Sequence, residues 1–143
     1  MLDESKPSID WDSLTFSFTE TDRMFISKCQ QGGEWEDGIM QDYQELRISP
    51  AAGVINYGQG LFEGMKARRS EDGRVLLFRP EHNARRSADG CRRLGMPPVS
   101  EEMFLEAVRK VVDENIRWLP PTGRGELYIC LLYTSDAADD LVG

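Results

Sequence analysis

The sequence has few of the residues that form metal or disulfide sites. It contains one histidine, His82, and three cysteines, Cys29, Cys91 and Cys130, which show neither a CxxC pair nor metal-ligand spacing. A site built from several histidines is therefore excluded. An odd number of cysteines also argues against a secreted disulfide framework, so a reducing compartment fits better.

Long apolar runs are missing as well. No segment approaches the roughly 20 apolar residues that a transmembrane helix requires. The N-terminus has neither the apolar core of a secretory signal nor the Arg- and Ser-rich, acid-poor composition of a transit peptide. The sequence therefore predicts a soluble intracellular protein with no membrane partner.

The chain of 143 residues is 40% hydrophobic and 29% charged, which is typical of a single soluble globular domain. Its net charge of −8 is uneven, because residues 1–45 carry −8 whereas residues 46–100 carry +5. The basic middle can attract an anion. We do not expect nucleic acid as a partner, because these arginines fall within predicted helix and strand without an RNA-binding signature.

The most distinctive stretch is INYGQGLFEGMKARR, residues 55–69. Its closely spaced glycines let the backbone turn, or approach another group, where a Cβ would clash. The stretch carries two aromatic residues, Tyr57 and Phe62. Taken alone, rings of this kind serve core packing more often than binding.

Local signals predict the secondary structure around this stretch. A hairpin is expected early in the chain, from alternating residues around 16–28 and 38–48. Further elements are expected as follows: a helix starting at Ser49–Pro50, strands over 64–69 and 75–79 joined by the Asp72–Gly73 turn, a helix over 81–94 after Pro80, a helix capped by Ser100, and a strand over 126–130.

The segment NYGQGLFEGMKARR, followed by DGRVLLFRPEHNARR, resembles the signature of branched-chain amino acid aminotransferases. These are class IV, fold-type IV enzymes that use pyridoxal 5′-phosphate, and the likeness is to the subgroup of plants and many bacteria. It begins near Ile9, where IDWDSLTF fits the family, and ends at Ile129. The FEG motif, with FRP and Arg86 at the family's distance, is its most specific part.

The resemblance implies particular roles for four residues. Arg86 matches the arginine that binds the cofactor phosphate, and a guanidinium suits phosphate oxygens. The other three, Tyr57, Phe62 and Tyr128, match positions that line the pocket for the substrate side chain. Without the family match, a solvated helix face would be the better interpretation of Arg86.

No catalytic residue is expected within the chain. The family's Schiff-base lysine lies well beyond position 143, in a larger C-terminal domain, and Lys66 stands where the family has no such lysine. We expect Lys66 to be solvated or ion-paired. The chain alone is therefore expected to be inactive.

The resemblance also implies the fold and its limits. The expected fold is α+β, the small N-terminal domain of fold-type IV aminotransferases, with two helices packed on an antiparallel sheet. Residues 1–15 form a polar lead-in, residues 16–129 the domain, and residues 130–143 a divergent tail. In that tail Cys130 replaces an arginine that, in the family, helps to recognise the substrate carboxylate.

The implied function of the intact enzyme is exchange of an amino group between Leu, Ile or Val and 2-oxoglutarate, by a homodimer. Its compartment would be the cytoplasm, or a plastid or mitochondrion if a transit peptide is missing from this chain. Two alternatives stay open. One is another fold-type IV enzyme, a D-amino acid aminotransferase or aminodeoxychorismate lyase, and the other is a non-catalytic truncated homologue that acts as an interaction domain.

The tail is open to a direct test. If residues 130–143 are a sequencing or assembly artefact, resequencing the source transcript across the Ile129 codon should show arginine and proline codons. The reading frame should then continue into a lysine-bearing second domain. A confirmed tail followed by a stop codon would instead identify a truncated homologue, and the catalytic interpretation should then be dropped.

Overall fold

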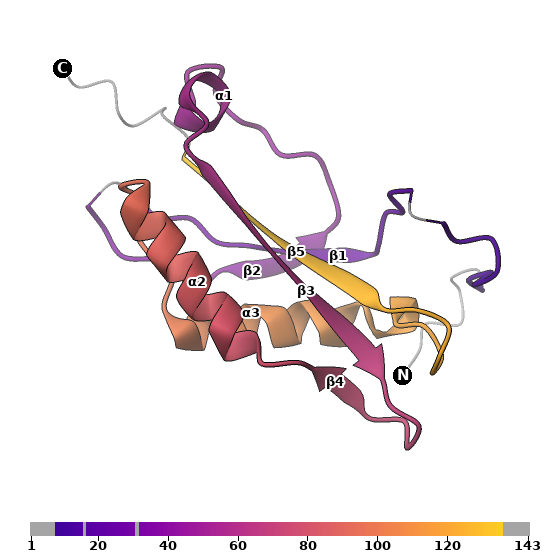
Figure 1. The fold of residues 1–143 in the computed structure, drawn as a ribbon. Coiled ribbons are helices and arrows are strands. Elements are labelled where there is room, and N and C mark those ends of the chain that lie inside the picture. Colours follow the sequence, from indigo (N-terminus) through magenta and orange to yellow (C-terminus); the bar gives the residue numbers. More distant parts are fainter. Residues whose placement is uncertain (1–7, 16, 31, 136–143) are drawn as a thin grey trace.

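The computed structural model describes residues 8–15, 17–30 and 32–135. Helices and antiparallel strands combine in an α+β fold, as predicted (Figure 1). In chain order, the elements of these described ranges are β1 (Arg23–Ile26), β2 (Ile39–Asp42), α1 (Gly53–Tyr57), β3 (Gly60–Arg69), β4 (Val75–Leu77), α2 (Pro80–Arg93), α3 (Glu101–Glu114), the 3₁₀ helix η1 (Ile116–Trp118) and β5 (Leu127–Thr134).

The longest strand, β3, lies at the centre of a three-stranded antiparallel sheet of order β4–β3–β5. It pairs with β5 from Gly60 opposite Thr134 to Ala67 opposite Leu127. At its other end, residues 67–69 pair with β4, so the predicted hairpin is confirmed. The strand β4 ends at Leu77, two residues earlier than expected, because Arg79 adopts a left-handed conformation before Pro80 and leads directly into α2.

The two long helices begin where local signals predict. Pro80 occupies the first turn of α2, where its missing N–H costs no hydrogen bond, and Gly95 follows the helix with φ of 70°. At the start of α3, the Ser100 hydroxyl oxygen accepts a hydrogen bond from the Met103 N–H at 3.1 Å. Both predicted helices are confirmed.

The hydrophobic core lies between these helices and one face of the sheet (Figure 1). Small residues allow the close approach, since Ala67 of β3 and Ala84 of α2 are both buried. Because side chains of a strand alternate between faces, the inward residues of β3 and β5 meet the helices. The buried core residues are Ala67, Ala84, Phe104, Val108, Val112, Leu119 and Ile129.

Three further boundaries differ from the prediction. The strand expected over 64–69 begins at Gly60, because its pairing with β5 extends four residues further. The helix expected from Ser49–Pro50 begins at Gly53, because the Ser49 hydroxyl accepts from the Ala51 N–H and stabilises a turn instead. The final strand runs to Thr134 rather than Cys130, because its pairing with β3 continues. The tail predicted to begin at Cys130 thus starts inside β5, and residues 136–143 lie outside the described residues. Whether it is family sequence stays a prediction.

The early hairpin forms a sheet of its own rather than joining the larger one. Its strands β1 and β2 pair from Arg23 opposite Asp42 to Ile26 opposite Ile39. The expected strand residues before Arg23 do not form a strand: Phe18 is exposed, and Phe16 lies outside the described residues. The hairpin contacts α3 instead.

Asn115, directly after α3, joins the hairpin to that helix. Its side chain is 1% exposed, and its Oδ1 accepts from the backbone N–H groups of Asp22 and Arg23, each at 3.0 Å. Its Nδ2 donates to the carbonyl oxygens of Arg23 at 3.0 Å and Val111 at 2.8 Å. One buried amide therefore satisfies four backbone groups from two distant parts of the chain.

We expect Asn115→Ala to lower the free energy of unfolding by about 2–4 kcal/mol, because it leaves buried backbone groups without partners. Equilibrium unfolding in urea measures this change. The exposed Asp113→Ala, on the same helix, is the control and should change stability by less than about 0.5 kcal/mol. A loss of under about 1 kcal/mol for Asn115→Ala would contradict the assigned role.

Candidate functional site

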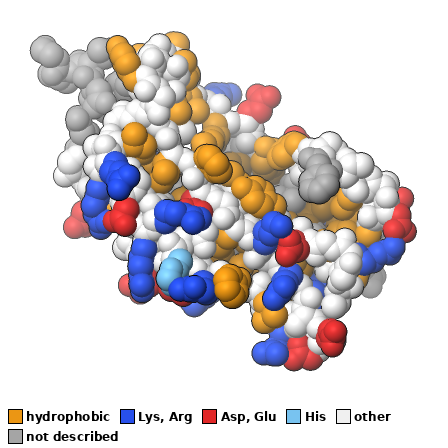
Figure 2. Space-filling view, viewed as in Figure 1, with side chains coloured by type: hydrophobic (Ala, Val, Ile, Leu, Met, Phe, Trp, Pro, Cys, Tyr) orange, Lys and Arg blue, Asp and Glu red, His pale blue; other side chains and the backbone are white. Residues whose placement is uncertain are grey.

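The face of the β3–β5 pair opposite the core carries exposed rings. Phe62 of β3 is 70% exposed, and Tyr128 of β5 is 57% exposed. Leu132, which pairs with Phe62, lies on the same face. Figure 2 shows hydrophobic side chains gathered along this part of the molecule, with arginine side chains of α2 beside them. The fold thus brings two of the predicted site residues onto one open surface.

Gly64 shapes this surface. Tyr128 stands opposite Lys66 in the register, yet its ring leans along β3 to lie over Gly64. A Cβ at residue 64 would overlap the Tyr128 hydroxyl and its ring. The glycine of the FEG motif therefore allows the phenol ring to pack on the backbone, on the Phe62 side of Lys66.

Arg86, on α2, lies beside the same segment of β3. Its Nε donates to Oε2 of Glu63 at 2.7 Å, and its Nη2 donates to Oε1 at 2.6 Å. Glu63 is 6% exposed, whereas the Arg86 side chain is 70% exposed. The guanidinium therefore bridges a buried carboxylate and solvent.

Further hydrogen bonds hold the Glu63 carboxylate. Its Oε1 also accepts from Asn83 Nδ2 and from the Gly64 N–H, each at 3.0 Å. Hydrogen bonding from Arg86 lowers the pKa of Glu63 most, with smaller help from Asn83 and Gly64 against the opposing effect of burial. The same contact raises the pKa of Arg86. Both groups are therefore ionised at neutral pH.

Tyr57 and Lys66 occupy separate positions. Tyr57 ends α1 and is 88% exposed, and no hydrogen bond or ring contact within the described ranges joins it to Phe62, Tyr128 or Arg86. Lys66 forms an ion pair with Glu126, with Nζ 2.6 Å from Oε2. The prediction that Lys66 is an ion-paired side chain is confirmed.

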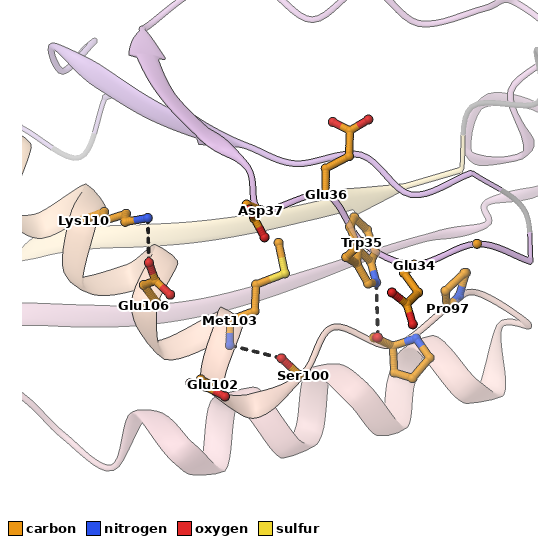
Figure 3. Close-up of a pocket in the computed structure, with 12 residues that line it drawn as sticks. Glu34, Trp35, Glu36, Asp37, Pro97, Ser100, Glu102, Met103, Glu106 and Lys110 are labelled. Atoms are coloured by element: carbon orange, nitrogen blue, oxygen red, sulfur yellow. Dashed lines mark hydrogen bonds and ion pairs between the residues drawn. The ribbon is translucent and has the colours of Figure 1, made fainter.

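Away from this surface, a hollow lies between the loop after β1 and the start of α3 (Figure 3). Trp35 lies in it and donates from Nε1 to the Pro98 carbonyl at 3.2 Å, while Lys110 is paired with Glu106. Its walls carry none of the predicted site residues. Its carboxylates, which would repel an anionic ligand, belong to Glu34, Glu36, Asp37, Glu102 and Glu106.

Two further classes of site find no support in the part of the chain that the structure describes. No three histidine, cysteine or acidic side chains there are grouped so that they could hold a metal ion. Likewise, none of the helices there has the length and apolar character needed to cross a bilayer.

Comparison with known proteins agrees with the family resemblance of the sequence motif. No protein-family model matches the chain. The chain is 52% identical over 121 residues to the chloroplastic branched-chain-amino-acid aminotransferase 5 of Arabidopsis thaliana. It is 50% identical over 137 residues to the mitochondrial branched-chain-amino-acid aminotransferase 1 of the same plant. This chain is a relative of the branched-chain aminotransferases. The matches cover 85% and 95% of the chain but only 29% and 36% of those proteins.

A solved structure confirms the fold of this relative. The branched-chain aminotransferase from Thermoproteus uzoniensis, determined with norvaline, matches with a TM-score of 0.58 at 22% identity. The match covers 80% of the chain and 33% of the archaeal protein. The predicted α+β fold is therefore confirmed, and the match spans about a third of the archaeal protein.

The most buried member of the site was missed by sequence reasoning. Glu63 was part of the quoted FEG motif but received no role, and neither did Asn83. A signal was present, because alternation in β3 places Glu63 on the same face as the buried Ala67. A carboxylate on the packed face of a strand needs a partner.

The residues present fit the phosphate of pyridoxal 5′-phosphate. Glu63 occupies the Nε and Nη2 edge of the Arg86 guanidinium, which leaves the edge formed by Nη1 and Nη2 directed away from that carboxylate. The exposure of Arg86 allows an anion to reach this edge, and a guanidinium edge matches two phosphate oxygens.

The lowered pKa of Glu63 predicts an acid-sensitive contribution to stability. This contribution is complete above the carboxyl's pKa in the unfolded chain and is lost as the pH falls through the lower pKa in the folded chain. The unfolding free energies of wild type and Glu63→Gln should therefore converge as the pH falls below 4.5, the ordinary pKa of a glutamate carboxyl. Urea unfolding across this range measures the difference.

The matched control is Glu126→Gln, which removes a carboxylate directly before β5 but leaves Glu63 and Arg86 in place. This variant should keep the wild-type loss of stability in acid. A constant difference between wild type and Glu63→Gln at every pH would contradict the assignment of the ionised carboxylate as the stabilising species.

Proposed function

We propose that this chain is part of a branched-chain amino acid aminotransferase. The intact protein would exchange an amino group between Leu, Ile or Val and 2-oxoglutarate, with pyridoxal 5′-phosphate as cofactor. The observation that carries the proposal is the identity of about half of the matched residues with plant enzymes of that name. The exposed rings of the β3–β5 face support it, and so does Arg86, which contacts Glu63 of the same strand.

The cofactor supplies the electron sink that amino-group transfer requires, and the chain supplies binding and orientation. Arg86 binds the phosphate through its free guanidinium edge. Phe62 and Tyr128 surround an aliphatic side chain by apolar contact, and Tyr57 extends that pocket when the remaining parts of the protein are in place. Glu63 holds Arg86, which fixes the anion site relative to the pocket.

Two requirements of the reaction are not met by this chain. Lys66 is engaged with Glu126, so the Schiff-base lysine is proposed to lie in a part of the intact protein outside this sequence. Cys130, opposite Gly64 in the register and exposed, stands where the family has its carboxylate-binding arginine. A thiol donates only a weak hydrogen bond. The chain is therefore proposed to be inactive alone.

The assembly and the compartment also belong to the proposal. A homodimer is expected for the intact enzyme, and the exposed apolar face supports a partner surface, because such patches usually become covered. The named plant relatives are chloroplastic and mitochondrial. A plastid or a mitochondrion, or the cytoplasm if no targeting segment exists, is the proposed location.

The activity test uses a full-length version of the gene. We expect conversion of leucine, isoleucine and valine in the presence of 2-oxoglutarate, and no turnover by the 143-residue chain. Arg86→Ala should weaken binding of pyridoxal 5′-phosphate about 10- to 100-fold, because charge-assisted hydrogen bonds to phosphate are lost. Cofactor absorbance during dialysis measures this change.

The control for this variant is Arg68→Ala, which removes an exposed arginine of β3 away from Glu63. It should leave cofactor affinity within about twofold of wild type. Activity of the full-length protein on D-alanine but not on leucine would replace the proposal with the D-amino acid aminotransferase alternative.

A further inference from the structure

The acid of the FEG motif is placed to act on a ligand that it does not touch. We propose that Glu63 is a positioning residue, which holds one edge of Arg86 so that the other edge faces the phosphate of the cofactor. This inference rests on the proposed function, because it needs Arg86 to be an anion-binding residue. It adds a residue to the site to which the family resemblance gave no role.

The first argument is the geometry of the guanidinium. Both oxygens of Glu63 are used, one by Nε and one by Nη2 of Arg86, in a two-point contact. Such a contact fixes the guanidinium plane as well as its position. Three N–H groups remain, two on Nη1 and one on Nη2, and the Arg86 side chain as a whole is 70% exposed.

The second argument is that Glu63 is itself held in place. The Gly64 N–H and Asn83 Nδ2 both donate to its Oε1, and Asn83 Nδ2 also lies 3.1 Å from the Gly64 carbonyl oxygen, to which it donates. Asn83 precedes Arg86 by one helical turn on α2, so both partners come from one helix face. The carboxylate cannot rotate without breaking contacts to β3 and to α2.

The third argument concerns charge. Glu63 offsets the positive charge of Arg86, so its presence lowers the purely Coulombic attraction of the site for an anion. At this place the Glu63 carboxylate contributes to the orientation of Arg86 and not to the attraction of an anion. This separates the proposal from a simple charge effect, because removing Glu63 increases the local positive charge but frees the Nε edge of Arg86.

Direction matters here because Phe62 adjoins Glu63 in β3. Neighbouring strand residues point to opposite faces, so Phe62 enters the proposed substrate surface while Glu63 anchors Arg86 on the other side. A fixed Glu63–Arg86 contact therefore sets the distance between the phosphate site and the substrate ring. Amino-group transfer needs the cofactor and the substrate to be held in one defined geometry.

The test uses the 143-residue chain with ¹⁵N-labelled arginine and inorganic phosphate as the probe, followed by NMR at about pH 6, where Glu63 is ionised. In wild type, the Arg86 Nε–H should exchange with water at least about tenfold more slowly than that of the exposed Arg68, because Glu63 accepts its hydrogen bond. Phosphate should shift the Arg86 Nη signals and leave Nε–H unchanged.

In Glu63→Gln, the Nε–H should exchange as fast as that of Arg68, and phosphate should now shift Nε–H as well, because both edges are accessible. Glu63→Asp keeps the charge on a shorter side chain and should protect Nε–H partly. Glu126→Gln, the matched loss of one carboxylate, should behave as wild type. A role confined to stability would not change which edge phosphate contacts.

The outcomes separate this inference from the proposed function. Phosphate shifts at Arg86 that are identical in wild type, Glu63→Asp and Glu63→Gln would overturn the positioning role while leaving Arg86 as an anion site. No phosphate shift at Arg86 in wild type would overturn both the positioning role and the assignment of Arg86 as the anion site. The aminotransferase proposal itself rests on sequence identity and is decided by the activity test. If Glu63→Gln fails to fold, wild type still decides, since an unprotected Arg86 Nε–H contradicts the proposal.

Discussion

A carboxylate on the packed face of a sheet must be neutralised, and the way this happens at Glu63 sets the position of α2. Burying an unpaired charge is far more costly than any single packing contact gains. Two residues of α2, one turn apart, meet this requirement together: Asn83 and Arg86 both donate to Glu63. If the helix slid along β3 or turned about its own axis, the buried carboxylate would lose these donors and would be left unpaired. The same constraint places the one arginine that matches a phosphate-binding position.

The two faces of β3 explain why a small domain can provide a binding surface. Its inner face carries the buried residues Ala67 and Glu63, and the small side chain of Ala67 lets the helices pack closely. Its outer face is left to Phe62, together with Tyr128 from β5, and these rings remain exposed. Because side chains alternate between the two faces of β3, one face contributes to stability and the other is available for binding. Exposed rings lower the solubility of the isolated chain. An exposed apolar patch of this kind usually marks a surface that another surface covers.

The features that the sequence predicted and those that it missed differ in range. The starts of α2 and α3 depend on residues within one turn, such as Pro80 and Ser100, and both were predicted correctly. The end of α3 was not, because that helix was expected to continue past Arg117 to Pro120, whereas it ends at Glu114. Ser49 and Pro50 misled, because the same residues stabilise either a helix start or a turn, and the choice depends on the residues after them. The extension of β5 to Thr134 depends on pairing with Gly60, 74 positions earlier, which no local pattern reports. Within the site, the Phe62 and Arg86 assignments came from the family motif, whereas the link between them through Glu63 required the docked helix. The roles of all four predicted site residues stay predictions.

The bond set of Asn115 has a consequence for synthesis on the ribosome. The hairpin that it completes lies 92 and 93 positions earlier in the chain, so β1 and β2 emerge long before their buried partner is translated. Until then the N–H groups of Asp22 and Arg23 can bond only to water, and a two-stranded hairpin alone is marginally stable. The hairpin therefore gains the contacts of Asn115 only after α3 has been translated. Contacts of such long sequence separation slow folding, because the loop between the two partners must be closed before they can form.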